Sequence, residues 1–103
     1  MSKNYSLSII TPMGEVLSRP VESLIAPGQY GRIGVMANHA PMIVALRIGI
    51  LAVRHDDTWS YFAIGEGVLE VSPDEVLILA DEAVPAKNEQ EARDKERELV
   101  EAY

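Results

Sequence analysis

Apolar and polar residues alternate with a period of two in several short stretches of the first 86 residues, and this pattern is typical of half-buried β-strands. Residues 5–9 alternate Tyr, Leu and Ile with two serines. Two further apolar stretches, at residues 16–17 and 21–26, are separated by Pro20. Because proline cannot donate a hydrogen bond to a neighbouring strand, Pro20 predicts an edge strand or a bulge.

Two hairpins are predicted further along the chain. The first joins residues 50–53 to residues 59–64 across a polar His-Asp-Asp-Thr turn. The second joins residues 68–71 to residues 76–80, and Pro73 between them suits the second position of a type I turn. Many short strands with no helical period between them predict a mainly β fold, a flattened antiparallel β-sandwich. No stretch between the strands is suited to the crossover helix of a parallel βαβ unit.

The last part of the chain has a different pattern. Residues 87–103 contain four basic and six acidic residues and neither Gly nor Pro. Asn88 is a candidate N-cap, and Glu89 precedes Arg93 by four residues, a spacing that stabilises a helix. Glu91 and Lys95 have the same spacing. The chain is therefore divided into a β-sandwich domain at 1–86 and a single short C-terminal helix at 87–103.

The apolar side of this helix is narrow. Its apolar residues are Ala92, Leu99, Val100 and Tyr103. We expect the helix to be weakly held to the sandwich, and the alternative is a frayed, solvated tail.

Composition excludes several classes of function. The formal net charge is −7 and the basic residues are scattered, so neither nucleic acid nor an anionic membrane surface is an expected partner. The absence of cysteine excludes disulfides and fits a reducing cytoplasm. No apolar run has the length of about 18 residues needed to span a bilayer, so membrane association is expected only through a partner.

Groups that could carry out catalysis are also missing. His39 and His55 are the only histidines, and neither has an acidic or histidine partner at a helical metal-ligand spacing, so no metal site is expected. No nucleophile and base can be paired. The glycine-rich segment 28–34 matches neither the P-loop nor the dinucleotide fingerprint, and its glycines instead predict turns or positive φ angles beside a strand. We therefore expect a noncatalytic protein without a cofactor.

The loop at residues 37–46 admits two interpretations. His39 and Pro41 lie in a polar segment that leads into an apolar run. In the first, His39 is a histidine packed in the core. Alternatively, Pro41, Met42 and Val44 form a protein-binding patch, because methionine adapts its shape to a partner.

Five short motifs occur in a characteristic order along the chain. They are Gly31-x-Ile33-Gly34-Val35, His39-Ala40-Pro41, Gly49-Ile50-Leu51, Gly67-Val68-Leu69-Glu70-Val71 and Val76-x-Ile78-Leu79-Ala80-Asp81-x-Ala83. In this order they resemble the epsilon subunit of F-type ATP synthases over residues 5–84. The resemblance implies a noncatalytic rotor subunit at the foot of the central stalk. Such a subunit docks gamma onto the c-ring and couples ion translocation to ATP synthesis and hydrolysis, at the cytoplasmic face of the inner membrane.

The resemblance also implies which residues make these contacts. The segment that faces gamma in the family corresponds to His39, Pro41, Met42 and Val44. The turn that meets the c-ring corresponds to Gln29, Tyr30, Gly31 and Arg32. Relatives often have an acidic residue where Arg32 stands, so we expect the facing c-ring loop to be less basic than usual.

The tail departs further from the family pattern. Relatives commonly have two C-terminal helices, of which the second can contact the alpha/beta hexamer and inhibit hydrolysis, whereas one helix is expected here. Some relatives bind ATP through an Ile/Leu-Asp-x-x-Arg-Ala motif, of which only Arg93 is kept within residues 89–94. We therefore expect coupling without inhibition by the tail. The alternative function is a nucleotide-sensing regulatory β-domain of a larger complex, and an enzyme is the third.

Overall fold

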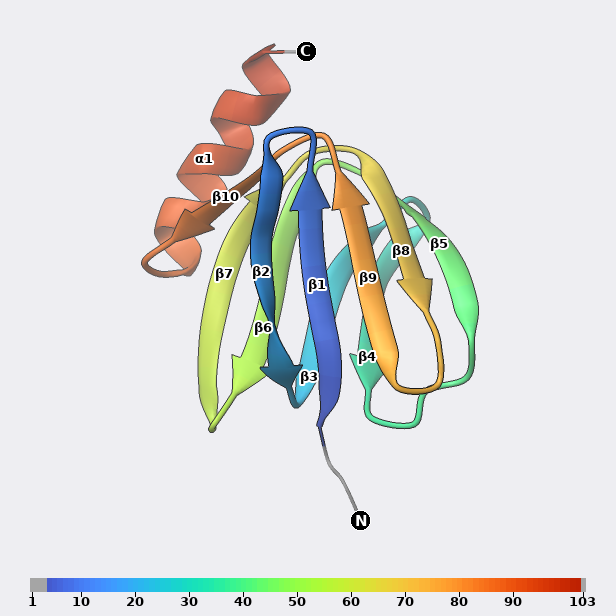
Figure 1. Cartoon of the computed structure of the whole chain (residues 1–103). Helices are drawn as coiled ribbons and strands as arrows, with labels where there is room; N and C mark the ends of the chain where they lie inside the picture. Colours follow the sequence, from blue (N-terminus) through green and yellow to red (C-terminus); the bar gives the residue numbers. More distant parts are fainter. Residues whose placement is uncertain (1–3, 103) are drawn as a thin grey trace.

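The structure is a computed structural model that describes residues 4–102, which form ten strands and one helix (Figure 1). The strands are β1 (Tyr5–Thr11), β2 (Gly14–Val21), β3 (Ser23–Gly28), β4 (Gly31–Met36), β5 (Met42–Leu46), β6 (Gly49–His55), β7 (Thr58–Ile64), β8 (Gly67–Val71), β9 (Glu75–Ala80) and β10 (Ala83–Ala86). The helix is α1 (Glu89–Ala102).

The strands form one curved sheet that folds over on itself as a sandwich (Figure 1). Their order is β10-β7-β6-β3-β5-β8-β9-β1-β2, and β4 branches from this path because it pairs with β3. Strand alternation turns every second side chain inward, and Leu7, Ile9, Leu51, Leu69 and Ile78 are fully buried between the layers. The predicted β-sandwich followed by one helix is confirmed.

Both predicted hairpins are confirmed. In the first, His55 pairs with Thr58, and Asp56 and Asp57 form the turn with φ angles of 51° and 60°. Two central residues with positive φ are the mark of a type I′ turn, whose twist matches that of the strands. In the second hairpin, Val71 pairs with Val76.

Two details of the sequence prediction are wrong. Pro20 does not interrupt a strand, because β2 continues through it to Val21, although β2 is the edge strand that this proline predicted. The pairing is also not wholly antiparallel, because β1 and β9 run parallel, with Leu7 opposite Val76. A parallel pair needs a long connection, and here seven intervening strands supply it in place of a crossover helix.

The helix is capped as predicted. The Glu91 N–H donates to the Asn88 side-chain oxygen at 2.8 Å, and Arg93 and Glu89 form an ion pair at 2.8 Å. α1 packs against β6, β7 and β10, and its buried residues are Ala92 and Leu99.

Two features of this region differ from the prediction. Val100 is 53% exposed, so its expected place in the packed stripe is wrong, and Tyr103 lies outside the described residues. Strand β10, which the sequence did not reveal, pairs with β7 and leads the chain to the helix.

Candidate protein-docking surfaces

The outer face of four adjacent strands carries a continuous row of apolar side chains. Across this face Ile10 of β1 lies opposite Leu79 of β9, Leu79 lies opposite Val68 of β8, and Val68 lies opposite Ala45 of β5. Ile43, two residues from Ala45 on β5, is 73% exposed, and Leu79 is 44% exposed. We call Ile10, Ile43, Ala45, Val68 and Leu79 the outer strip.

The outer strip stands out because its members adjoin one another. A single exposed leucine is normal on a protein surface, whereas a contiguous apolar row usually marks a contact with another molecule. Sequence analysis missed it because β5 (MIVAL) and β9 (EVLILA) are apolar on both faces, so period-two alternation cannot assign their sides. The signal in the sequence that could have indicated the outer strip is that β5 and β9 contain more apolar residues than one buried face of a strand requires.

The four residues expected to face gamma are not brought onto one surface. His39 lies in the β4–β5 loop with its ring Nδ1 2.8 Å from the Ala40 carbonyl oxygen, and its side chain is not buried, so the interpretation as a core histidine is wrong. Pro41 is exposed. Met42 and Val44 are half-buried and pack against the core, because they alternate along β5 with the outward-facing Ile43.

The expected c-ring segment is a tight turn between β3 and β4. Gln29 and Tyr30 form its tip, and Tyr30 is 97% exposed. Gly31 has a φ of 147°, and a Cβ added at Gly28 would lie 2.5 Å from the Gly31 carbonyl oxygen, so both glycines are needed for the turn. The Gln29 N–H donates to the Ala45 carbonyl at 2.9 Å and so fixes the turn to β5.

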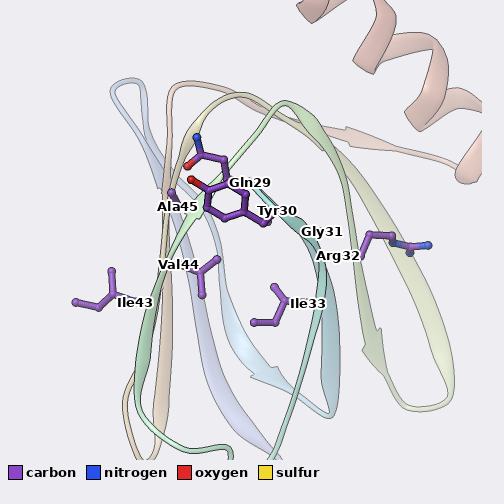
Figure 2. A pocket seen from close by; sticks show the side chains of 9 residues that line it. Gln29, Tyr30, Gly31, Arg32, Ile33, Ile43, Val44 and Ala45 are labelled. Atoms are coloured by element: carbon purple, nitrogen blue, oxygen red, sulfur yellow. The ribbon is translucent and has the colours of Figure 1, made fainter.

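Arg32 is separated from this tip. Figure 2 shows its side chain on the opposite side of β4 from Ile33. There it lines a cavity of about 220 Å³ together with Glu89, Arg93 and Glu96 of α1. The structure therefore places the Arg32 side chain beside α1, on the other side of β4 from Ile33.

One buried polar group ties the two layers together. The Tyr5 hydroxyl on β1 donates to the Val35 carbonyl on β4 at 2.7 Å. Burial raises the pKa of the Tyr5 hydroxyl above its ordinary value, because the phenolate would lose its hydration. Tyr5 therefore fixes the position of β4 relative to β1.

Two further properties of the described residues concern metal binding and membrane spans. Within residues 4–102, no three His, Cys, Asp or Glu side chains are grouped so as to hold a metal ion. In the same part of the chain, the helix is too short and too polar to cross a bilayer.

Comparison with known proteins agrees with this architecture. Residues 4–86 match the family model "ATP synthase, Delta/Epsilon chain, beta-sandwich domain". The ATP synthase epsilon chain of Syntrophobacter fumaroxidans is 42% identical over 86 residues, which are 84% of this chain and 64% of that one. The epsilon chain of Pelotomaculum thermopropionicum is 37% identical over 91 residues, which are 88% of this chain and 68% of that one.

Solved structures show the same likeness. A chain in the Euglena gracilis mitochondrial ATP synthase structure, described as OSCP/F1/c-ring, has a TM-score of 0.80 and 25% identity over 99% of this chain and 66% of its own. A chain in the Tetrahymena thermophila central stalk and c-ring structure has a TM-score of 0.68 at 13% identity, over 98% of this chain and 96% of its own, and shows the shared fold. The chain spans roughly two thirds of the length of the curated relatives that it matches. On the match to residues 4–86, the chain belongs to the family of ATP synthase delta/epsilon chains with a β-sandwich domain.

Proposed function

We propose that this chain is a noncatalytic subunit of the central stalk of an F-type ATP synthase, which docks gamma onto the c-ring and couples ion translocation to ATP synthesis and hydrolysis. The outer strip carries this proposal, because it is a contiguous apolar surface on a rigid sheet. A partner that covers the strip buries its side chains and gains the hydrophobic contribution of their area. In this arrangement the chain is peripheral, at the cytoplasmic face of the membrane, and is held there through the complex.

The c-ring is proposed to meet the β3–β4 turn. Tyr30 supplies a large aromatic surface at the tip, and the glycines at positions 28 and 31 hold the tip in a fixed conformation. Arg32 lines a cavity with Glu89, Arg93 and Glu96 of α1, so its side chain lies beside the helix. The expectation that the facing c-ring loop is less basic than usual stays a prediction.

The helix is proposed to stay on the sandwich without inhibiting hydrolysis. Extension of α1 toward the alpha/beta hexamer would expose Ala92 and Leu99, which are 0% and 6% exposed in the docked position. Addition of the chain to a complex that lacks this subunit should therefore restore coupling and leave the rate of ATP hydrolysis nearly unchanged. Strong suppression of hydrolysis would contradict this part of the proposal.

The docking surface can be tested by calorimetry with the purified gamma subunit of the same organism. Leu79→Glu places a carboxylate in the centre of the outer strip. Because this carboxylate would lose its hydration when gamma binds, the affinity of the chain for gamma should fall at least tenfold. Val100→Glu is the matched control, because Val100 is similarly exposed but lies on α1. Equal affinity of the two variants and the unmodified chain would exclude the outer strip as the docking surface.

A further inference from the structure

The sheet is left open between β4 and β5. Among the described residues β4 pairs with β3 alone, and β5 meets β3 at the single pair formed by Gly28 and Leu46. Figure 2 shows the two strands diverging below the β3–β4 turn, with Ile33 and Val44 facing one another across the gap. Together with residues of the turn, these side chains line a groove of about 410 Å³.

A hydrogen bond on the far side of β3 fixes which backbone groups of β4 face this groove. The Pro27 carbonyl of β3 accepts from the Arg47 N–H at 2.9 Å, so the backbone of Pro27 is turned away from β4. Its partner in the register is Arg32. In an antiparallel ladder, when the backbone N–H and C=O groups of one residue point away from the neighbouring strand, those of the residue paired with it also point away. The same orientation recurs at every second residue along each strand. The N–H and C=O groups of Arg32 and Gly34 therefore point into the groove.

The same argument applies to the opposite strand. The Ala45 carbonyl accepts from the Gln29 N–H, so the backbone of Ala45 is turned away from β8. Ile43 lies two residues earlier on β5 and has the same orientation. Its N–H and C=O groups therefore face the groove from the other side. An extended segment between β4 and β5 would find hydrogen-bonding groups on both flanks.

The other two edges of the sheet are blocked, but β4 is not. The edge strand β2 contains Pro20, and the edge strand β10 contains Pro85 and lies against α1. Proline and covering elements are the usual protection of an edge against pairing with another chain. Strand β4, with the sequence GRIGVM, has no proline and a single charge. Its open edge is therefore suited to pair with an added strand.

We propose that an extended segment of the gamma-type partner inserts as a strand beside β4 in this groove, with alternate apolar side chains over Ile33 and Val44. The proposal rests on the proposed function and adds a second mode of contact, strand addition, to the apolar one. Gamma is the occupant because the groove is continuous with the outer strip. Ile43 belongs to the strip and also lines the groove, so a partner that covers the strip reaches the open edge.

The first test is amide hydrogen exchange on the full chain, alone and in a one-to-one complex with the purified gamma subunit. Strand insertion should slow exchange of the Arg32, Gly34 and Ile43 amides at least tenfold, because each would gain a hydrogen-bond acceptor. Unchanged exchange at all three positions in a formed complex would overturn the proposal. Protection of the same amides in the isolated chain, with a dimer in sedimentation, would overturn it too, because the occupant would then be a second copy.

The second test removes one donor from the edge. Gly34→Pro deletes an N–H that points away from β3, so the β3–β4 ladder keeps its bonds. Gly34→Ala is the matched control, because an added Cβ meets only the Leu24 carbonyl at 3.9 Å. Gly34→Pro should bind gamma at least tenfold more weakly than Gly34→Ala, and both should melt within a few degrees of the unmodified chain.

The outcomes separate the two proposals. If the unmodified chain does not bind gamma, the proposed function fails and the insertion fails with it. If the unmodified chain and both Gly34 variants bind equally, docking stands and the insertion is wrong. If Gly34→Pro does not fold, the exchange measurement on the unmodified chain decides the question.

Discussion

The hydrogen bond between Tyr5 and Val35 makes a prediction that can be measured in both sign and size. Tyr5→Phe removes the hydroxyl and leaves the ring, so packing is kept and one contact across the sandwich is lost. The donor is 6% exposed and lies 2.7 Å from its acceptor. A buried hydrogen bond of this kind contributes about 1–1.5 kcal/mol, so at pH 7 the variant should melt roughly 5–10 °C lower.

The same bond makes the difference depend on pH. Burial raises the pKa of Tyr5 in the folded state, whereas the unfolded chain has the ordinary pKa of about 10. A group whose folded pKa is raised contributes its stability below the unfolded pKa and loses it as pH rises toward the folded pKa. At pH 11, one unit above the unfolded value, the unmodified chain should lose about 1.4 kcal/mol that Tyr5→Phe does not lose.

The assay is denaturant unfolding of both proteins at pH 7 and pH 11, with the tyrosinate absorbance difference between them as a direct titration of Tyr5. The advantage of the unmodified chain should shrink to about zero at pH 11. An advantage that is unchanged at pH 11 would mean that Tyr5 ionises normally in the folded chain. The Tyr5 hydroxyl would then not lie in a contact with β4 that excludes water.

Four further outcomes follow from single features of the structure. Gly67→Ala should cost about 2–3 kcal/mol in urea unfolding, because the added Cβ would lie 2.7 Å from the Ala80 Cα, a backbone atom. Leu99→Ala should speed amide exchange throughout α1 and leave the β1–β9 ladder unchanged, since Leu99 packs the helix onto the sandwich. Asp57→Gly should stabilise the chain by about 0.5–1 kcal/mol, because Asp57 holds a φ of 60° and its exposed ion pair with Arg54 contributes little. Calorimetry with ATP should give no binding heat, and a measurable heat would favour the nucleotide-sensing alternative.

Local features of this fold could be predicted from the sequence because they depend on neighbouring residues. The hairpin turn at Asp56 and Asp57 and the cap at Asn88 are each decided within a few residues. The parallel pairing of β1 with β9 could not be predicted in the same way. It joins segments that are about 70 residues apart, and several strands of similar composition compete for each edge.

The docking surfaces were the hardest part to predict, and the reason is physical. Whether Val44 or Ile43 faces outward depends on the register of β5 against β8, and a shift of one residue would exchange the two faces. The sequence indicates that residues 42–46 are apolar but not which of them packs in the core. This explains why the segment that the resemblance assigned to gamma, at His39, Pro41, Met42 and Val44, adjoins the outer strip but shares no residue with it.

The open edge of β4 could not be predicted from the sequence either. Prolines lie in the edge strands β2 and β10, at positions 20 and 85, whereas β4 contains no proline, so nothing in its sequence indicates a third edge. Within residues 4–102, β3 pairs with β4 on one side and with β5 and β6 on the other, and β4 pairs with β3 alone, which leaves its second edge open. An unprotected edge beside an apolar face leaves a monomer open to unwanted pairing, and it becomes useful only when a partner covers both. The groove and the outer strip are therefore most simply understood as two parts of one interface.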